Sequence, residues 1–231
     1  AASIGHAQLV CLPEMFCCPY QTSLFRDYSE PYPGPATQAL SRMAKENGVH
    51  LIGGSIPELG EDGVSLFNTS FVFGPSGEFL AKHRKLHLFD VDVPGGIKFK
   101  ESDSLSPGIT PTVFETPWCK VGLGICFDIR FHELSRWYAL KAGCSMIVYP
   151  GSFNMTTGPA HWELLVRSRA LDNQLFVAAV AQARDYQASY VSWAHSMVAG
   201  PWGDVIAQAD VTEQIVYADI DLSKVSSVRK S

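Results

Sequence analysis

Two segments far apart in the chain share one unusual pattern. Residues 71–81 and 197–207 each read as an apolar strand, a Gly-Pro-x-Gly turn and a second strand. Glycine and proline in that arrangement favour a tight turn between antiparallel strands. One such hairpin in each half of the chain predicts two sheets that are built alike and packed face to face, with helices outside them. The alternative is that the two turns are unrelated.

Short apolar runs alternate with helical patterns, which is typical of an α/β protein. The helical patterns cover residues 36–47, 132–142 and 159–173, and Gly48 and Gly143 follow the first two as stop signals. Apolar side chains spread around much of the third pattern, so we expect that helix to be covered on more than one side. The runs expected to form strands lie at 8–12, 49–53, 71–73, 120–125, 145–149, 175–181 and 215–217.

Charge and composition narrow the function. The chain has 231 residues and a net charge of −5, with acidic and basic residues interspersed, so it lacks the basic patch typical of nucleic-acid-binding proteins. Its apolar runs are too short to span a bilayer, and we expect no membrane association. Six cysteines without paired spacing argue against a disulfide framework or a zinc site and favour a reducing compartment. We expect one soluble, intracellular domain that binds a small neutral or anionic molecule.

Cys126 is the strongest candidate for a catalytic group. It follows the apolar run 120–125 and precedes a polar turn and a helical pattern. Its side chain would therefore lie at the junction where a strand ends and the chain turns toward a helix. Folds present nucleophiles in this way, but the chain has five other cysteines, and buried cysteine is common. Glu14 follows an apolar strand and Pro13, and Lys85 ends the second strand of the first hairpin. Taken singly, Glu14 reads as a solvated strand end and Lys85 as an exposed edge lysine.

Together these residues lie in three segments that resemble the nitrilase superfamily of carbon-nitrogen hydrolases. The segment Leu-Pro-Glu at 12–14 resembles the Glu motif of that superfamily, and His-Arg-Lys-Leu-His-Leu-Phe-Asp at 83–90 resembles its Lys motif. The Cys motif is resembled by Gly-Ile-Cys-Phe-Asp-Ile-Arg-Phe at 124–131, so the three motifs occur in the same order. The resemblance covers essentially the whole chain. It is closest to the omega-amidase branch, which residues 53–58, 89–95, 149–163 and 188–196 also resemble.

The resemblance implies a four-layer αββα sandwich that forms a single carbon-nitrogen hydrolase domain over residues 1–231. It also implies that the family's first strand and most of its first helix would precede Ala1. Residues 1–5 agree with this, because they read like the last turn of a helix that runs directly into a strand at 6–12.

Relatives in the superfamily are also dimers, so the resemblance implies a homodimer. The helix at 132–142 and the helix that begins at Pro159 are expected to form the interface. Trp137, Tyr138 and Trp162 would be its aromatic anchors, because interfaces favour such side chains.

By the same resemblance, Cys126 is the nucleophile and Glu14 the general base. Lys85 is the cation that stabilises the tetrahedral intermediate, together with the backbone N–H of Phe127. Glu101 matches a second glutamate that holds the lysine and positions the substrate amide. A carboxylate can take the thiol proton and return it to departing ammonia, so we expect neither a metal nor a cofactor.

The residues that follow the nucleophile point to the substrate class. True nitrilases of the superfamily tend to carry Trp-Glu there, whereas this chain has Phe127 and Asp128, which favours an amide over a nitrile. Arg130 matches an arginine that grips a substrate carboxylate in relatives, a task that a guanidinium fork suits. The alternative is a salt bridge from Arg130 to Asp128 or Glu133. The expected substrate-binding residues are Arg130, Phe127, Phe153 and Thr157.

The implied activity is that of an omega-amidase, which releases ammonia from the terminal amide of 2-oxoglutaramate or 2-oxosuccinamate. A deaminated glutathione amidase is the alternative within the superfamily, although residues 89–93 and Asn173 favour the omega-amidase. A second alternative pairs Cys126 with a histidine base. A third is a silent interaction module with the same fold. The expected compartment is the cytoplasm, with the mitochondrion or a plastid as alternatives. The histidines available to the second alternative are His132, His161 and His195.

Overall fold

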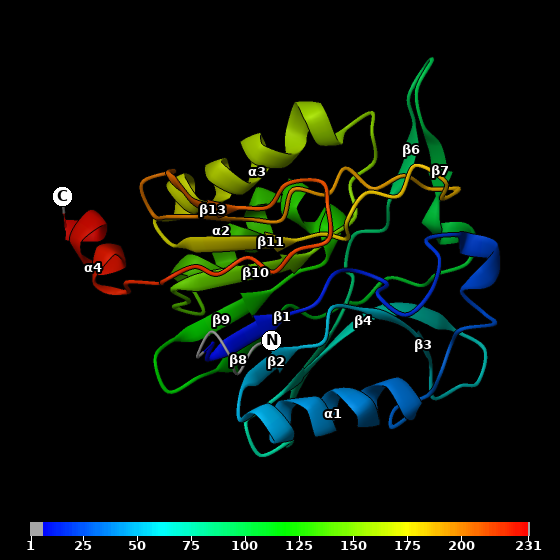
Figure 1. The fold of residues 1–231 in the computed structure, drawn as a ribbon, viewed down its shortest axis with the longest axis horizontal. Coiled ribbons are helices and arrows are strands. Elements are labelled where there is room, and N and C mark those ends of the chain that lie inside the picture. Colours follow the sequence, from blue (N-terminus) through cyan, green and yellow to red (C-terminus); the bar gives the residue numbers. More distant parts are fainter. Residues whose placement is uncertain (1–6, 231) are drawn as a thin grey trace.

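Two β-sheets lie face to face between outer helices in a computed structural model that describes residues 7–230. Helix α1 (Pro35–Asn47) covers one sheet, and α2 (His132–Leu140) and α3 (Gly158–Asn173) cover the other (Figure 1). The layers therefore follow the order helix, sheet, sheet, helix. The α/β class and the αββα sandwich are as the sequence predicts.

The first sheet contains five strands in the order β1-β2-β4-β3, with β5 paired to the long strand β4. Only β1 and β2 are parallel within it, and the pairing of β4 with β5 is the first predicted hairpin. The strands are β1 (Leu9–Cys11), β2 (His50–Ile52), β3 (Ile56–Leu59), β4 (Leu66–Phe73) and β5 (Phe79–Arg84).

The second sheet contains six strands in the order β13-β12-β11-β10-β9-β8. Strands β9, β10 and β11 are parallel in its centre, and β12 with β13 is the second predicted hairpin. A separate two-stranded ribbon of β6 (Asp90–Asp92) and β7 (Lys98–Lys100) projects from the body (Figure 1). The strands of the second sheet are β8 (Thr112–Glu115), β9 (Lys120–Leu123), β10 (Met146–Pro150), β11 (Phe176–Val180), β12 (Met197–Ala199) and β13 (Val205–Gln208).

Apolar packing between the sheets holds the layers together. Val72 of the first sheet and Leu123 and Val148 of the second belong to one buried cluster. Burial of one such side chain is worth about 1.5–3 kcal/mol, so the inter-sheet cluster is a principal source of stability. Helix α1 ends at Gly48, whose φ of 62° is the left-handed conformation that glycine adopts most easily. A last helix, α4 (Ser223–Lys230), and three short 3₁₀ helices (Thr22–Leu24, Glu101–Asp103 and Cys126–Arg130) complete the secondary structure of the described residues.

The predicted strand at 215–217 is wrong. These residues have an irregular conformation, and the side chains of Ile215 and Tyr217 are 60% and 49% exposed. Three apolar residues in a row satisfied the pattern, but they are not part of any strand of the two sheets in residues 7–230. The helical turn expected at 1–5 lies outside the described residues. The strand expected at 6–12 is described from residue 7 on, and β1 at Leu9–Cys11 confirms it.

Two of the three expected dimer anchors are also wrong. Tyr138 and Trp162 are 0% and 2% exposed and belong to the core between α2, α3 and the second sheet. Their polar atoms are satisfied inside the chain, because Tyr138 donates to the carbonyl of Leu123 and Trp162 to that of His195. Trp137 is exposed, as predicted.

Among residues 7–230, the helices are all too short or too polar to cross a lipid bilayer.

Candidate active site

Cys126 occupies a sharp turn between strand β9 and helix α2. It opens the 3₁₀ helix Cys126–Arg130, and its φ is 46°, in the left-handed region that residues other than glycine rarely adopt. Its side chain is almost fully buried, and the backbone N–H of Ser152 donates to its Sγ at 3.5 Å. A strained turn of this kind presents one side chain at the carboxyl edge of a sheet, as nucleophile turns do.

Asp128 holds this turn in place. Its Oδ2 accepts from the backbone N–H of Ile125 at 2.9 Å and faces Nε2 of His83 at 3.0 Å. Its Oδ1 accepts from the backbone N–H of His87 at 2.9 Å and faces Nδ1 of the same ring at 2.8 Å. Burial alone would raise the pKa of Asp128, but these hydrogen bonds outweigh it and hold that pKa far below its usual range. A permanent carboxylate therefore ties the turn to the segment that follows β5.

Glu14, Lys85 and Glu101 form one buried cluster. The Lys85 ammonium donates to Oε1 of Glu14 at 3.0 Å and to Glu101 at 2.9 Å, and all three side chains are 0% exposed. Glu14 follows β1, Lys85 follows β5 and Glu101 opens the 3₁₀ helix after β7. The N–H and the C=O of Lys85 are both hydrogen-bonded to backbone, to Asn68 and Gly108 respectively, which fixes where its long side chain starts.

The cluster and the thiol shift one another's pKa values. Burial raises the pKa of Glu14, and Lys85 only partly opposes this shift. Burial would lower the pKa of Lys85, but Glu101 and Glu14 raise it well above its ordinary value, so the amine stays charged. Burial and then the charge of Glu14 raise the pKa of the Cys126 thiol, which therefore rests in the protonated form. Glu14 and the Cys126 thiol each shift the pKa of the other, which is consistent with two groups that lie close together.

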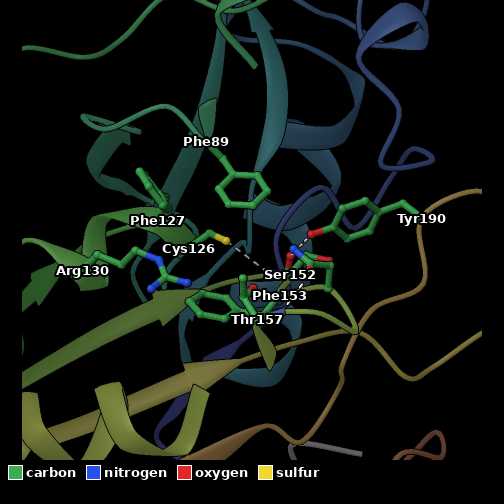
Figure 2. A pocket seen from close by; sticks show the side chains of 9 residues that line it. Phe89, Cys126, Phe127, Arg130, Ser152, Phe153, Thr157 and Tyr190 are labelled. Carbon is green, nitrogen blue, oxygen red and sulfur yellow. Dashed lines mark hydrogen bonds between the residues drawn. The ribbon is translucent and has the colours of Figure 1, made fainter. Parts of the chain in front are cut away.

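A small pocket opens at Cys126 (Figure 2). Arg130 points into it, with its guanidinium carbon 5.5 Å from the ring centre of Phe127 and 5.1 Å from that of Phe153. It is the one charged side chain among the described residues that line the pocket. Those residues are Phe89, Cys126, Phe127, Arg130, Ser152, Phe153, Asn154, Thr157 and Tyr190.

Arg130 has a different partner from those weighed on the sequence. Its Nη2 lies 3.2 Å from Nδ1 of His161, and its buried Nε has no hydrogen-bond partner in the described structure. The Asp128 carboxylate faces His83 and His87 instead, and the Glu133 carboxylate lies 3.4 Å from Nδ1 of His132. Both salt bridges considered as alternatives are therefore absent within residues 7–230. The guanidinium keeps donor capacity for a ligand.

Comparisons with known proteins identify the family of this chain. A family model described as carbon-nitrogen hydrolase matches residues 1–230. The chain belongs to the carbon-nitrogen hydrolase family. The resemblance seen in the sequence is thereby confirmed, and the chain is an enzyme that hydrolyses carbon–nitrogen bonds.

Several curated relatives of this carbon-nitrogen hydrolase are named omega-amidase NIT2. The chain is 59% identical to omega-amidase NIT2 of Xenopus tropicalis, over 97% of the chain and 80% of the relative. It is 58% identical to omega-amidase NIT2 of Homo sapiens, over 100% of the chain and 82% of the relative. Among solved structures, Saccharomyces cerevisiae Nit3, a member of branch 10 of the nitrilase superfamily, matches with a TM-score of 0.89 and 42% identity over 96% of this chain and 80% of that one. The C. elegans NitFhit protein matches with a TM-score of 0.84 and 33% identity, over 99% and 56%.

The structure of this carbon-nitrogen hydrolase brings the residues singled out in the sequence into two groups that meet at Cys126. Glu14, Lys85 and Glu101 form the buried cluster. Phe127, Arg130, Phe153 and Thr157 line the pocket. Their individual roles stay predictions.

Other polar residues of the site were missed. Asp128 was weighed as a mark of amide substrates and as a partner of Arg130, but not as the residue that holds the turn. Asn154 could have been found, because asparagine is a typical residue just before a helix. In the structure, its Oδ1 accepts from the backbone N–H groups of Thr156 and Thr157, both at 2.9 Å, ahead of α3. Tyr20 and Tyr190 lie in irregular segments that have no periodic pattern.

The described part of the chain contains no group of three or more His, Cys, Asp or Glu side chains that could hold a metal ion, and all six of its cysteines are free.

Proposed function

We propose that this hydrolase is an omega-amidase that converts 2-oxoglutaramate or 2-oxosuccinamate into the dicarboxylate and ammonia through a cysteine thioester. One observation carries the proposal: the pocket at the Cys126 thiol has the Arg130 guanidinium in its wall and no carboxylate among the residues that line it. A small amide with a negatively charged far end suits such a pocket. The names of the curated relatives support the same activity.

The first half of the reaction acylates the enzyme. Glu14 takes the thiol proton on its free Oε2 while the Cys126 sulfur attacks the amide carbon. The carbonyl π electrons move to the oxygen, where the Lys85 ammonium and the backbone N–H of Phe127 stabilise the negative charge. One such donor is worth about 3 kcal/mol in a closed site. Glu14 then gives the proton to the amide nitrogen, the carbon–nitrogen bond breaks, and ammonia leaves.

The second half hydrolyses the thioester. A water molecule replaces ammonia and gives one proton to Glu14 as its oxygen attacks the thioester carbon. The carbon–sulfur bond then breaks, and Glu14 returns the proton to the sulfur, so the enzyme regains its starting state. The raised pKa of Glu14 suits this double use, because a carboxyl group that binds a proton more tightly can both accept and deliver one near neutral pH.

The far wall of the pocket is built to hold an anion. Arg130 can donate two parallel hydrogen bonds to a carboxylate, and the rings of Phe127 and Phe153 beside it limit where the guanidinium can lie. Helix α3 begins beside the pocket residue Thr157, so the positive end of its dipole favours negative charge there. The buried Nδ2 of Asn154 has no partner in the described structure and is a donor for the 2-oxo group.

Replacement of Arg130 by lysine tests the substrate class. We expect Arg130→Lys to raise KM and to lower kcat/KM for 2-oxoglutaramate about thirtyfold, which corresponds to roughly 2 kcal/mol, because a point charge cannot reproduce the bidentate pair. Hydrolysis of a small uncharged amide should change much less. Ammonia release, measured with both substrates, gives the comparison.

Arg136→Lys is the matched control, because Arg136 lies on α2 and donates to the carbonyl of Asp172, away from the pocket. It should leave both substrates unaffected. If Arg130→Lys depressed charged and uncharged amides by the same factor, Arg130 would be structural and the omega-amidase proposal would lose its support, although the amidase chemistry would stand.

The remaining alternatives have less support. A histidine base would need a histidine at the thiol, but His132 lies against Glu133, His161 against Arg130 and His195 against the carbonyl of Ala209. A deaminated glutathione amidase would use the same chemistry, and a panel of amides separates the two. A silent interaction module would show no ammonia release from any member of that panel. The free cysteines fit the reducing cytoplasm as the compartment.

We also propose a homodimer through the outer face of α2 and α3. Trp137, Leu164 and Leu171 are 41%, 64% and 51% exposed there, which is unusual for large apolar side chains. We expect light scattering to report a dimer, and Leu164→Glu to shift it to a monomer, because a charge buried in an interface without a partner is costly. Ile109→Glu, at a residue 93% exposed in a loop before β8, should remain dimeric. A monomeric unmodified protein would contradict the proposal.

A further inference from the structure

Tyr20 touches both carboxylates of the buried cluster. It lies in the irregular segment after β1, with 8% of its surface exposed. Its hydroxyl is 2.6 Å from Oε1 of Glu101 and 3.2 Å from Oε1 of Glu14. Rings on three sides hold it there: Phe25 at 5.9 Å, Phe99 at 5.8 Å and Tyr190 at 4.6 Å between ring centres.

A phenol has one proton to donate. Burial, then the charges of Glu101 and Glu14, raise the pKa of Tyr20 well above its ordinary value, so the hydroxyl keeps that proton. The shorter distance assigns the donation to Glu101.

The two carboxylates differ in the donors that they receive. Glu101 receives the Lys85 ammonium and the Tyr20 hydroxyl, and its Oε2 also accepts from the backbone N–H of Phe89 at 2.7 Å. On Glu14, the donors Lys85 and Asn68 both reach Oε1, while Oε2 has no hydrogen-bond partner among the described residues. Each donor stabilises negative charge on the carboxylate that it reaches, so Glu101 receives more of this stabilisation than Glu14.

The net charge of the cluster makes the difference in donors between Glu14 and Glu101 important for where a proton binds. Two carboxylates and one ammonium leave one negative charge in a fully buried site, and a single added proton removes it. Two carboxylates in contact with one ammonium compete for that proton. The proposed catalytic cycle needs it on Glu14, because Glu14 is the proposed base for the Cys126 thiol.

We propose that Tyr20 is a positioning residue which directs the exchangeable proton to Glu14 by giving Glu101 a hydrogen-bond donor that Glu14 does not receive. The inference rests on the proposed roles of Glu14 and Cys126, but it does not depend on which amide is the substrate. It adds a fourth side chain to the Glu14–Lys85–Glu101 cluster.

Tyr20→Phe tests the inference, because it removes the hydroxyl and keeps the ring. The readout is the rate at which iodoacetamide alkylates Cys126 as a function of pH, followed by mass spectrometry of the peptide that contains Cys126. Without the hydroxyl, the cluster has one donor fewer to stabilise its negative charge, so it is protonated at higher pH. We expect the acid limb of the rate profile to move up by about one pH unit, with alkylation about tenfold slower below it.

Tyr138→Phe is the matched control. It also removes a buried tyrosine hydroxyl, one that donates to the carbonyl of Leu123, so it should lower the melting temperature and leave the acid limb in place. If Tyr20→Phe slowed alkylation by one factor at every pH with an unmoved limb, or changed nothing, the inference would be overturned.

A second variant keeps the inference testable if Tyr20→Phe does not fold. Tyr20→3-fluorotyrosine retains the ring and the hydroxyl but makes the hydroxyl a stronger donor, so it should move the acid limb down in pH. A shift in the other direction would contradict the inference. Alkylation needs no amide substrate, so a shifted limb in a protein that does not hydrolyse 2-oxoglutaramate would overturn the substrate proposal and support the role of Tyr20.

Discussion

Cys126→Ala will abolish amide hydrolysis while the fold is retained. With no sulfur at this position, no thioester can form, and removal of a nucleophile from a site of this type lowers kcat by about 10⁴-fold or more. The turn itself should persist, because Asp128 holds it through Ile125, His83 and His87. Ammonia release measures the activity, and circular dichroism with a thermal melt reports the fold.

Cys119→Ala is the control for this substitution. Cys119 is a half-buried free cysteine just before β9, and its removal should leave turnover close to that of the unmodified protein. Turnover by Cys126→Ala above about one hundredth of the normal rate would mean that the nucleophile lies elsewhere.

Lys85→Met should have the next largest effect, on both activity and stability. The substitution leaves Glu14 and Glu101 buried together without their shared cation, which we expect to lower the free energy of unfolding by about 3–5 kcal/mol near neutral pH. The oxyanion also loses a donor, so kcat/KM should fall by about 10³-fold or more.

The loss of stability should depend on pH in a particular direction. Glu14 already has a raised pKa, so its protonated form favours folding below the unfolded value of about 4.3, and that contribution is lost as pH rises through the folded pKa. Lys85→Met removes the main influence that lowers this pKa, so the carboxyl should take up a proton at still higher pH. Urea unfolding should therefore show a smaller deficit at about pH 5 than at about pH 8.

Lys82→Met separates this effect from the general loss of a lysine. The Lys82 side chain is 32% exposed and donates to Glu58 at 2.8 Å, while Arg84 also binds Glu58. Partly exposed pairs of this kind contribute about 1 kcal/mol or less, so the control should be mild and should retain activity. A deficit of Lys85→Met that is equal at all pH values would contradict the buried-cluster account.

The sequence predicted the helices and hairpins better than it predicted which of their faces are buried. The helices at 36–47 and 159–173 and both Gly-Pro-x-Gly hairpins are confirmed, because periodicity and turn chemistry are local properties. Tyr138 and Trp162 were misplaced because periodicity groups side chains on a face but does not say whether that face meets a sheet or solvent. The motifs located the site, and family resemblance was needed to connect them.

The polar support of the site could not be predicted. Asp128 and Tyr20 act through partners that are distant in the chain: His83 is 45 residues from Asp128, and Glu101 is 81 residues from Tyr20. No spacing rule relates such pairs, because only the tertiary structure brings them together. Their signal lies in the structure alone.

The way the site is assembled has a consequence for how the protein folds and fails. Glu14, Lys85 and Glu101 come from segments of the first half of the chain, whereas Cys126 and Arg130 follow a strand of the second sheet. Gln182 even donates to the backbone carbonyl of Glu14 across 168 residues of sequence. Contacts of such high sequence separation form slowly, since the entropy of closing a long loop must be overcome before they stabilise anything. We therefore expect activity to return late in refolding, when the two halves of the chain dock. A chain whose helices and strands have formed should remain inactive until that docking occurs.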